Sequence, residues 1–277
     1  MLVNSSVIIT VWRDPFRNLK GTANYLILNL AVCDFLVGFP GEFLIALLHW
    51  FPRKSITKAA YTALYLGFYA SFLTILGLAV ERLIVISSPV KSMDYLTSTY
   101  LALGVFCIWL LAGLLAFSPL LGWDSFSSYR VFVVDAFVFP IIILLFACYA
   151  RIFFLVRKGL YRDLTGGAGR EERSSLTRNA QAGEKLKRKE RSVAFSVFIL
   201  VGLFAVCWVP SIVLENITEF FGSSYVPYKY TSILQGLTFL HPLLNPIVYA
   251  LRTAKFRRAL RKIICNCNRD HSRRVIL

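Results

Sequence analysis

Long apolar segments separated by short polar ones run along almost the whole chain. A helix that crosses the roughly 30 Å hydrocarbon layer of a membrane needs about 20 mainly apolar residues. Six segments reach that length: residues 25–48, 59–87, 100–122, 131–156, 193–217 and 230–251. Residues 1–12 are apolar but shorter, so we interpret them as a seventh span truncated at its outer end. The pattern predicts an all-α fold, a seven-transmembrane-helix bundle over residues 1–252.

The chain ends with a different periodicity. Phe256, Leu260 and Ile263 or Ile264 fall on one face of a helix that begins near residue 253, and basic residues occupy the other face. A basic amphipathic helix of this kind lies on a membrane surface. Residues 253–277 are therefore interpreted as a short amphipathic membrane-surface helix followed by a cytoplasmic tail.

The longest connection, residues 157–190, is polar, carries Gly166, Gly167 and Gly169 close together and shows no apolar period. We expect a cytoplasmic loop that is flexible for much of its length. Its last part, residues 184–191, is a run of charges that is expected to extend the following helix beyond the bilayer.

Composition and charge then narrow the class of protein. Hydrophobic residues make up 57% of the 277 residues and charged residues 17%, whereas soluble domains average about 25% charged. The net charge of +16 would suit a nucleic acid or a membrane. If the seven spans alternate, 26 of the 31 Lys and Arg fall on one side, which is the positive-inside pattern. We expect the N-terminus outside and the C-terminus in the cytoplasm, with membrane lipids and no nucleic acid as partners.

One carboxyl group lies in the middle of a predicted span. Polar groups are costly there and are functional candidates by default. Asp34, Ser71 in the next span and Asn245 in the last carry oxygens that suit a small hard cation. Alternatively, a protonated Asp34 hydrogen-bonds to Asn245 and only stabilises the helix contacts. The residues alone leave both interpretations open.

A charged residue and two prolines indicate where the bundle could change conformation, at its cytoplasmic end and within two of its helices. Arg82, next to Glu81, either reaches to the interface or is clamped by Glu190 at the foot of the sixth span. Pro210 and Pro246 each remove a backbone hydrogen bond and kink their helices, which makes the neighbourhood of each a candidate hinge.

In this order, the residues resemble the rhodopsin-like (class A) G-protein-coupled receptors, from residue 4 to about residue 267. Each of the seven spans and the amphipathic helix contributes a marker: Asn4, Asp34, Glu81 with Arg82, Trp109, Pro140, Phe204 with Trp208 and Pro210, Asn245 with Pro246 and Tyr249, and Phe256. Any one of these is weak evidence, but the ordered set is specific.

The resemblance implies a plasma-membrane receptor that signals by conformational change and is not an enzyme. An extracellular or membrane-borne ligand would enter the outer half of the bundle, the sixth helix would swing out, and Arg82 would contact a heterotrimeric G protein. By similarity, an allosteric Na⁺ pocket would be lined by Asp34, Ser71, Asn245 and Trp208. The remaining activation switches would be Phe204, Pro210, Pro246, Tyr249 and Tyr149.

The chain departs from the family pattern at several positions. Thr57 stands where relatives carry a disulfide cysteine, and residues 123–130 contain none. His241 replaces a commoner Asn, which weakens the case for Na⁺. Pro140 and Tyr149 are nine residues apart where eight are usual. That spacing turns Tyr149 by about 100° unless a bulge absorbs the extra residue, so its pairing with Tyr249 is doubtful.

Two replacements bear on the ligand. Leu64 stands where amine receptors carry Asp, and Phe239 where opsins carry the retinal-binding Lys, so neither a monoamine nor retinal is expected. A lipid, a small apolar molecule and a basic peptide stay open. Candidate pocket residues in the outer half are Glu42, Leu64, Tyr65, Phe68, Glu215 and Phe239, together with Trp208.

Two cysteines near the end of the chain are candidate lipidation sites. Cys265 and Cys267, just past the amphipathic helix, are either palmitoylated or plain reduced thiols.

The alternative to a signalling receptor is a seven-span protein that does not signal, such as a lipid scramblase, a decoy or an incomplete receptor product.

Overall fold

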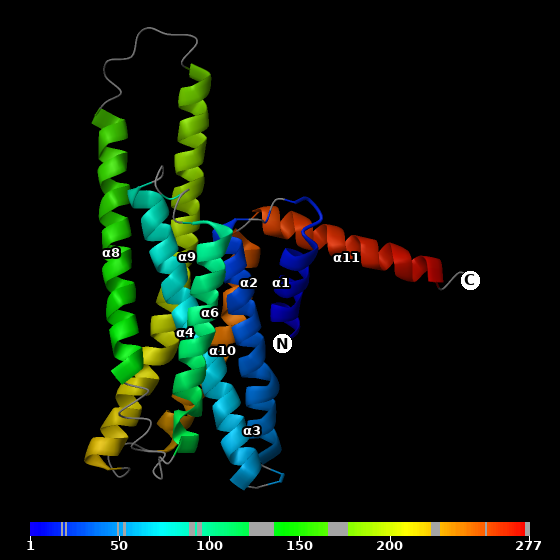
Figure 1. The fold of residues 1–277 in the computed structure, drawn as a ribbon, viewed down its shortest axis with the longest axis vertical. Coiled ribbons are helices and arrows are strands. Elements are labelled where there is room, and N and C mark those ends of the chain that lie inside the picture. Colours follow the sequence, from blue (N-terminus) through cyan, green and yellow to red (C-terminus); the bar gives the residue numbers. More distant parts are fainter. Residues whose placement is uncertain are drawn as a thin grey trace.

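The fold is a bundle of helices with one further helix at its end (Figure 1). The computed structural model describes residues 1–17, 19, 21–48, 50–51, 54–88, 92, 96–121, 136–165, 177–222, 228–252 and 254–274. Every regular element within these ranges is helical. In chain order they are α1 (Leu2–Arg13), α2 (Thr22–Leu36), η1 (Val37–Glu42), α3 (Phe43–Leu48), α4 (Lys54–Ser87), α6 (Ser98–Phe117), η2 (Ser118–Leu121), α8 (Ala136–Thr165), α9 (Thr177–Phe221), α10 (Tyr228–Arg252) and α11 (Ala254–Arg274).

Each of the seven predicted spans is found as a helix, and the all-α prediction is confirmed. The second span is divided into α2, η1 and α3, because Pro40 lies inside it and Phe39 leaves helical geometry at φ −148° and ψ 115°. Five helices in the described ranges are long and apolar enough to cross a membrane, while α1 has only 12 residues.

The expectation for residues 157–190 is corrected by the structure. Helix α8 continues to Thr165 and α9 begins at Thr177, so most of this segment is helical rather than an irregular loop. Its residues after position 177 are mainly Arg, Lys, Glu, Gln and Ala, which are strong helix formers even without an apolar face. The absence of an apolar period therefore did not indicate the absence of a helix.

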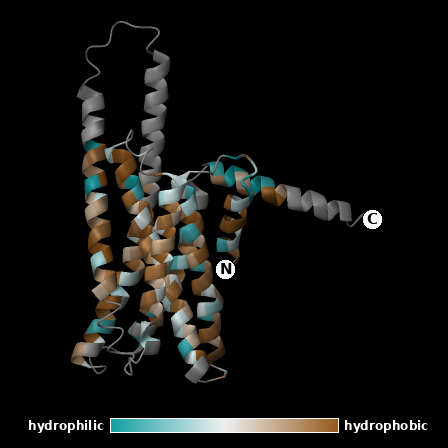
Figure 2. Cartoon of the chain, viewed as in Figure 1, coloured by the Kyte–Doolittle hydropathy of each residue, from teal (hydrophilic) through white to brown (hydrophobic). Residues whose placement is uncertain are grey.

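The outside of the bundle is apolar, as a lipid environment requires. Figure 2 shows mostly hydrophobic residues along the described parts of the bundle helices. Helix α6 is the extreme case, since only 11% of it is buried although its mean hydropathy is 2.3. A helix that is hydrophobic all round faces lipid on its unpacked sides.

Helix α4 is the centre of the bundle. Of the five membrane-length helices it is the most buried, at 61%. It packs against α2, η1, α6, α8 and α9. Gly67 lets α4 approach the second span closely, because a Cβ at this position would lie 2.7 Å from Val37 Cγ2 and 3.1 Å from the Cys33 carbonyl oxygen. Most of the functional groups described next include a residue of this central helix.

Candidate functional site

A buried polar group joins three helices in the interior of the bundle. Asp34 on α2 is 1% exposed and accepts hydrogen bonds at both carboxyl oxygens. Ser71 Oγ of α4 donates to Oδ1 at 3.1 Å, and Asn245 Nδ2 of α10 donates to Oδ2 at 2.8 Å. The structure therefore brings together the three oxygen-bearing residues that the sequence singled out. Asn245 Oδ1 is buried and has no hydrogen-bond partner among the described residues.

A second polar group links α2 to α4 and α6. Asn29 Nδ2 donates to Thr74 Oγ1 at 2.8 Å, and Trp109 Nε1 donates to Asn29 Oδ1 at 2.9 Å. Sequence reasoning assigned no role to Asn29, although a buried amide in an apolar span is itself a signal. A third such bond, from Asn4 Nδ2 to the Pro242 carbonyl oxygen at 3.0 Å, ties the short α1 to α10.

Aromatic rings are packed together between α4, α9 and α10. The Trp208 ring lies 4.7 Å from Phe68 and 4.6 Å from Phe72, both edge to face, and Phe204 lies 4.8 Å from Phe72. His241 of α10 packs edge to face on Phe204 at 5.5 Å. The rings are almost fully buried, so a rotation of α9 would have to move several of them together. Trp208 contributes a wall of this cluster and no oxygen ligand.

Near the end of α4, Arg82 is held by its own neighbour in sequence. Glu81 Oε2 accepts a hydrogen bond from Arg82 Nε, and Glu81 Oε1 accepts one from Arg82 Nη2. Thr22 Oγ1 of α2 also donates to Glu81 Oε1, at 2.8 Å. Both charged side chains are buried, which makes the pair a restraint rather than a solvated surface contact. The backbone of Glu190 lies in α9, but its side chain is outside the described residues, so the clamp with Arg82 stays a prediction.

The opposite end of the bundle carries a smaller polar group. Glu215 Oε1 on α9 accepts from Gln235 Nε2 of α10 at 3.3 Å and from Ser211 Oγ at 3.4 Å. Among the candidate pocket residues, Leu64 and Phe68 are buried, and the ring centroid of Phe239 lies 6.4 Å from that of Phe68. The remaining candidate pocket residues, Glu42 and Tyr65, are partly buried.

Comparison with known proteins decides the class. The family "7 transmembrane receptor (rhodopsin family)" matches residues 3–249. The chain belongs to the rhodopsin family of seven-transmembrane receptors. It is 28% identical to the adenosine receptor A2a of Homo sapiens and of Canis lupus familiaris, over 95% of this chain and 69% of each relative. It is 25% identical to "Rhodopsin, GQ-coupled" of Mizuhopecten yessoensis, over 94% of this chain and 56% of that protein's length.

The expected rotation of Tyr149 in this receptor is not observed. Helix α8 is continuous, and its buried stripe runs through Val138, Ile141, Leu145 and Tyr149 at helical spacing. Pro140 is exposed instead. Nine residues of α-helix make about two and a half turns, so Pro140 and Tyr149 lie on opposite faces of the helix, with the proline outside and the tyrosine inside. The side chain of Tyr249 lies outside the described residues, and its pairing with Tyr149 stays a prediction.

The cysteines after the last span lie on α11, which continues to Arg274. The Cys265 side chain is exposed, as a modification site must be. The side chain of Cys267 is outside the described residues. Palmitoylation of the receptor at these positions therefore stays a prediction.

Proposed function

We propose that this protein is a plasma-membrane receptor. It would bind an extracellular or membrane-borne ligand and transmit that binding to a heterotrimeric G protein in the cytoplasm. The ligand would enter the end of the bundle that holds Glu215 and Gln235, and the G protein would bind the end that holds Arg82. The distribution of basic residues supports this orientation, with the C-terminus in the cytoplasm.

One observation supports the proposal: four groups of interacting side chains lie at successive positions along the helices between the ligand end and Arg82. They are the Glu215–Gln235 hydrogen bond, the aromatic cluster around Trp208, the Asp34 group and the Glu81–Arg82 pair. Because these groups share α4, α9 and α10, a displacement of α9 by a ligand changes their packing together. Binding would then shift the population towards a state in which Arg82 is released.

The identity of the ligand is left open by the chemistry. Leu64 and Phe239 replace the charged residues that would hold a monoamine or retinal, and apolar and aromatic side chains dominate the candidate pocket. A screen of lipids, peptides and small metabolites that reads G-protein dissociation in cells tests the function, with Arg82→Gln as the inactive control. Silence across all three classes, with normal surface expression, would favour the non-signalling alternative.

Sodium binding at Asp34 is expected to show as a stability difference between salts. The Asp34 carboxylate, Ser71 Oγ and the unpartnered Asn245 Oδ1 are hard oxygen donors that fit the ion. Thermal unfolding of the purified receptor should occur at a higher temperature in NaCl than in equimolar KCl, with a stabilisation of about 1 kcal/mol at a few times Kd. Asp34→Asn should abolish the difference, while Asp14→Asn should preserve it. Equal stability of the unmutated receptor in both salts would instead support the protonated Asp34.

A further inference from the structure

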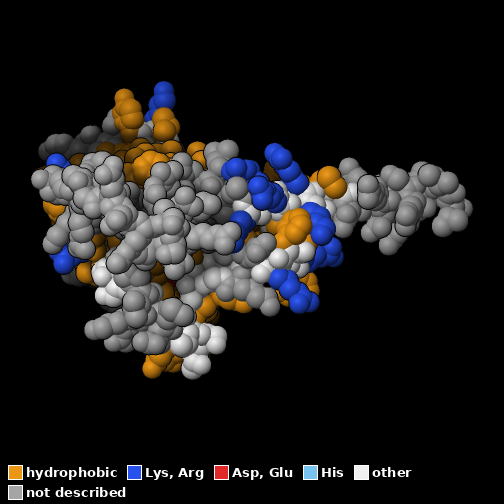
Figure 3. Space-filling view, turned by 90° about the horizontal axis from the view of Figure 1, so that it is seen from above, with side chains coloured by type: hydrophobic (Ala, Val, Ile, Leu, Met, Phe, Trp, Pro, Cys, Tyr) orange, Lys and Arg blue, Asp and Glu red, His pale blue; other side chains and the backbone are white. Residues whose placement is uncertain are grey.

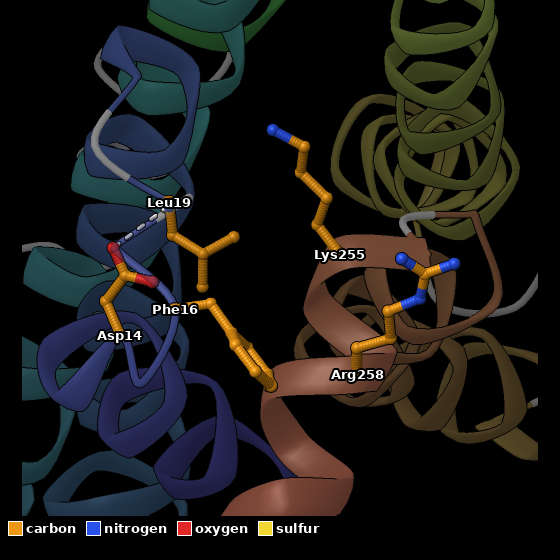
Figure 4. A pocket seen from close by; sticks show the side chains of 6 residues that line it. Asp14, Phe16, Leu19, Lys255 and Arg258 are labelled. Atoms are coloured by element: carbon orange, nitrogen blue, oxygen red, sulfur yellow. Dashed lines mark hydrogen bonds between the residues drawn. The ribbon is translucent and has the colours of Figure 1, made fainter.

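A cavity lies between the segment that follows α1 and the first turns of α11. It has a volume of about 180 Å³ and is lined by Asp14, Phe16, Leu19, Lys255, Arg258 and Ala259. Figure 4 shows the loop residues facing α11 across this space, with Lys255 extending into it. A water molecule occupies about 30 Å³, so the cavity has room for a small polar group, although not for a folded protein segment.

The charges at the cavity favour an anion. Lys255 and Arg258 lie three residues apart on one face of α11. Both are exposed, and neither is hydrogen-bonded or ion-paired to another residue in the described part of the chain. The carboxylate of the lining, Asp14, accepts the backbone N–H of Leu19 at 3.0 Å through Oδ2. The cavity thus presents two cations whose charge is not consumed by a described partner.

The floor and wall of the cavity are apolar. Leu19 is 3% exposed and Ala259 1% exposed, so both are fixed in the packed interior. Phe16 is half-exposed, and the Lys262 ammonium lies 4.5 Å from its ring centroid. This cation–π contact holds the loop against α11. A site with a cationic rim and an apolar base matches an amphipathic ligand better than it matches a free inorganic ion.

The position of the cavity identifies the kind of amphipathic molecule. Helix α11 leaves the bundle sideways (Figure 1), and the basic side chains of its described part lie together where it leaves (Figure 3). The exposed Ile264 and the partly buried Leu260 lie on the same helix as Arg257, Arg258 and Arg261. A helix of this composition lies in the interface between lipid headgroups and acyl chains. Lipid headgroups are therefore the anions that the cavity meets.

We propose that this cavity is a binding site for a membrane lipid whose headgroup carries a phosphate monoester, such as a phosphorylated phosphatidylinositol. A phosphate monoester carries a charge of about −1.5 to −2 near neutral pH, which matches the two cations of Lys255 and Arg258. Phe16 and Leu19 contact the glycerol end of the lipid. None of the residues that line the site belongs to the Glu81–Arg82 pair or to the candidate ligand pocket, and the test measures lipid binding without reference to signalling.

The test titrates fluorescent dioctanoyl phosphatidylinositol 4-phosphate onto the purified full chain in phosphatidylcholine nanodiscs and measures anisotropy. Lys255→Gln with Arg258→Gln should weaken binding at least tenfold. The matched control, Arg151→Gln with Arg261→Gln, removes the same charge from exposed residues that do not line the cavity. It should change the affinity less than twofold. Unchanged thermal unfolding temperatures establish that both double variants are folded.

Asp14→Asn is expected to strengthen lipid binding, whereas the double variant at Lys255 and Arg258 weakens it. It removes the negative charge of the lining and keeps an oxygen that can accept the Leu19 N–H, so lipid binding should tighten roughly two- to threefold. Equal weakening by the two double variants would overturn the proposal, because binding would then follow surface charge rather than the cavity. Equally tight binding of soluble inositol 1,4-bisphosphate would assign the cavity to a free anion. Displacement of the lipid by an acidic peptide at lower concentrations than by that soluble headgroup would assign it to a protein partner.

Discussion

Replacing Glu81 by Gln is expected to raise signalling in the absence of a ligand roughly three- to tenfold. Glutamine has nearly the same shape and keeps an oxygen that accepts the Thr22 hydroxyl, but it removes the charge that holds both guanidinium nitrogens of Arg82. Hydrogen bonds to charged groups contribute about 1.5–3 kcal/mol. Losing part of that restraint shifts the population towards the state with a released Arg82. Basal G-protein dissociation in cells, normalised to surface receptor, measures the effect.

Two further variants serve as comparisons for Glu81→Gln. Thr22→Val removes only the hydroxyl that donates to Glu81, so it should raise the basal level less than Glu81→Gln. Glu190→Gln tests the clamp that the sequence suggested, and it should also raise the basal level if a carboxylate on α9 restrains Arg82. A normal basal level in Glu81→Gln at full surface expression would show that this pair does not restrain the receptor.

Gly67→Ala is expected to cause the largest loss of stability among Gly→Ala substitutions at the bundle glycines that the structure describes. The new Cβ would meet Val37 Cγ2 at 2.7 Å, and the Val37 nitrogen and Cys33 carbonyl oxygen at 3.0 and 3.1 Å. Two of these contacts are backbone atoms that cannot rotate away, so α4 and the second span would have to separate. Overpacking of this kind costs about 1–3 kcal/mol. The thermal unfolding temperature of the purified receptor and its surface level in cells should both fall.

Gly202→Ala on α9 is the matched control for this substitution. Nothing in the described structure lies within 4 Å of a Cβ at position 202. The methyl group also reduces the conformational entropy of the unfolded chain, so this variant should be neutral or slightly stabilising. Equal unfolding temperatures for Gly67→Ala and Gly202→Ala would contradict the close approach of α4 to the second span.

The helices and part of the polar interior could be predicted because only a narrow range of sequences is stable as a membrane span. Twenty apolar residues in a row permit little besides a spanning helix, and a carboxyl group such as Asp34 is rare enough there to stand out. Its partners Ser71 and Asn245 were predicted as the oxygen-bearing groups of neighbouring spans. Of the helical segments between residues 157 and 190, only the part from residue 184 onwards was predicted, since an entirely polar helix leaves no apolar period.

Other contacts depend on geometry that the sequence pattern does not contain. Adjacent residues on a helix point about 100° apart, so the pairing of Arg82 with Glu81 was not predicted and a partner on α9 was sought instead. Asn29 meets Trp109 across 80 positions of chain. The cavity beside α11 depends on a loop with left-handed backbone at Asp14 and Arg17, for which the hydrophobic pattern carries no signal.

The most direct test of the account is nucleotide exchange on purified heterotrimeric G proteins by the receptor reconstituted in lipid. The rate of GTPγS binding should be higher with Glu81→Gln than with the unmutated receptor, and the double variant Glu81→Gln with Arg82→Gln should return it to the rate of receptor-free vesicles. That result would show that signalling passes through the released arginine. Rates that equal those of receptor-free vesicles for all three proteins, each folded and each tested across the G-protein subtypes, would contradict the central claim.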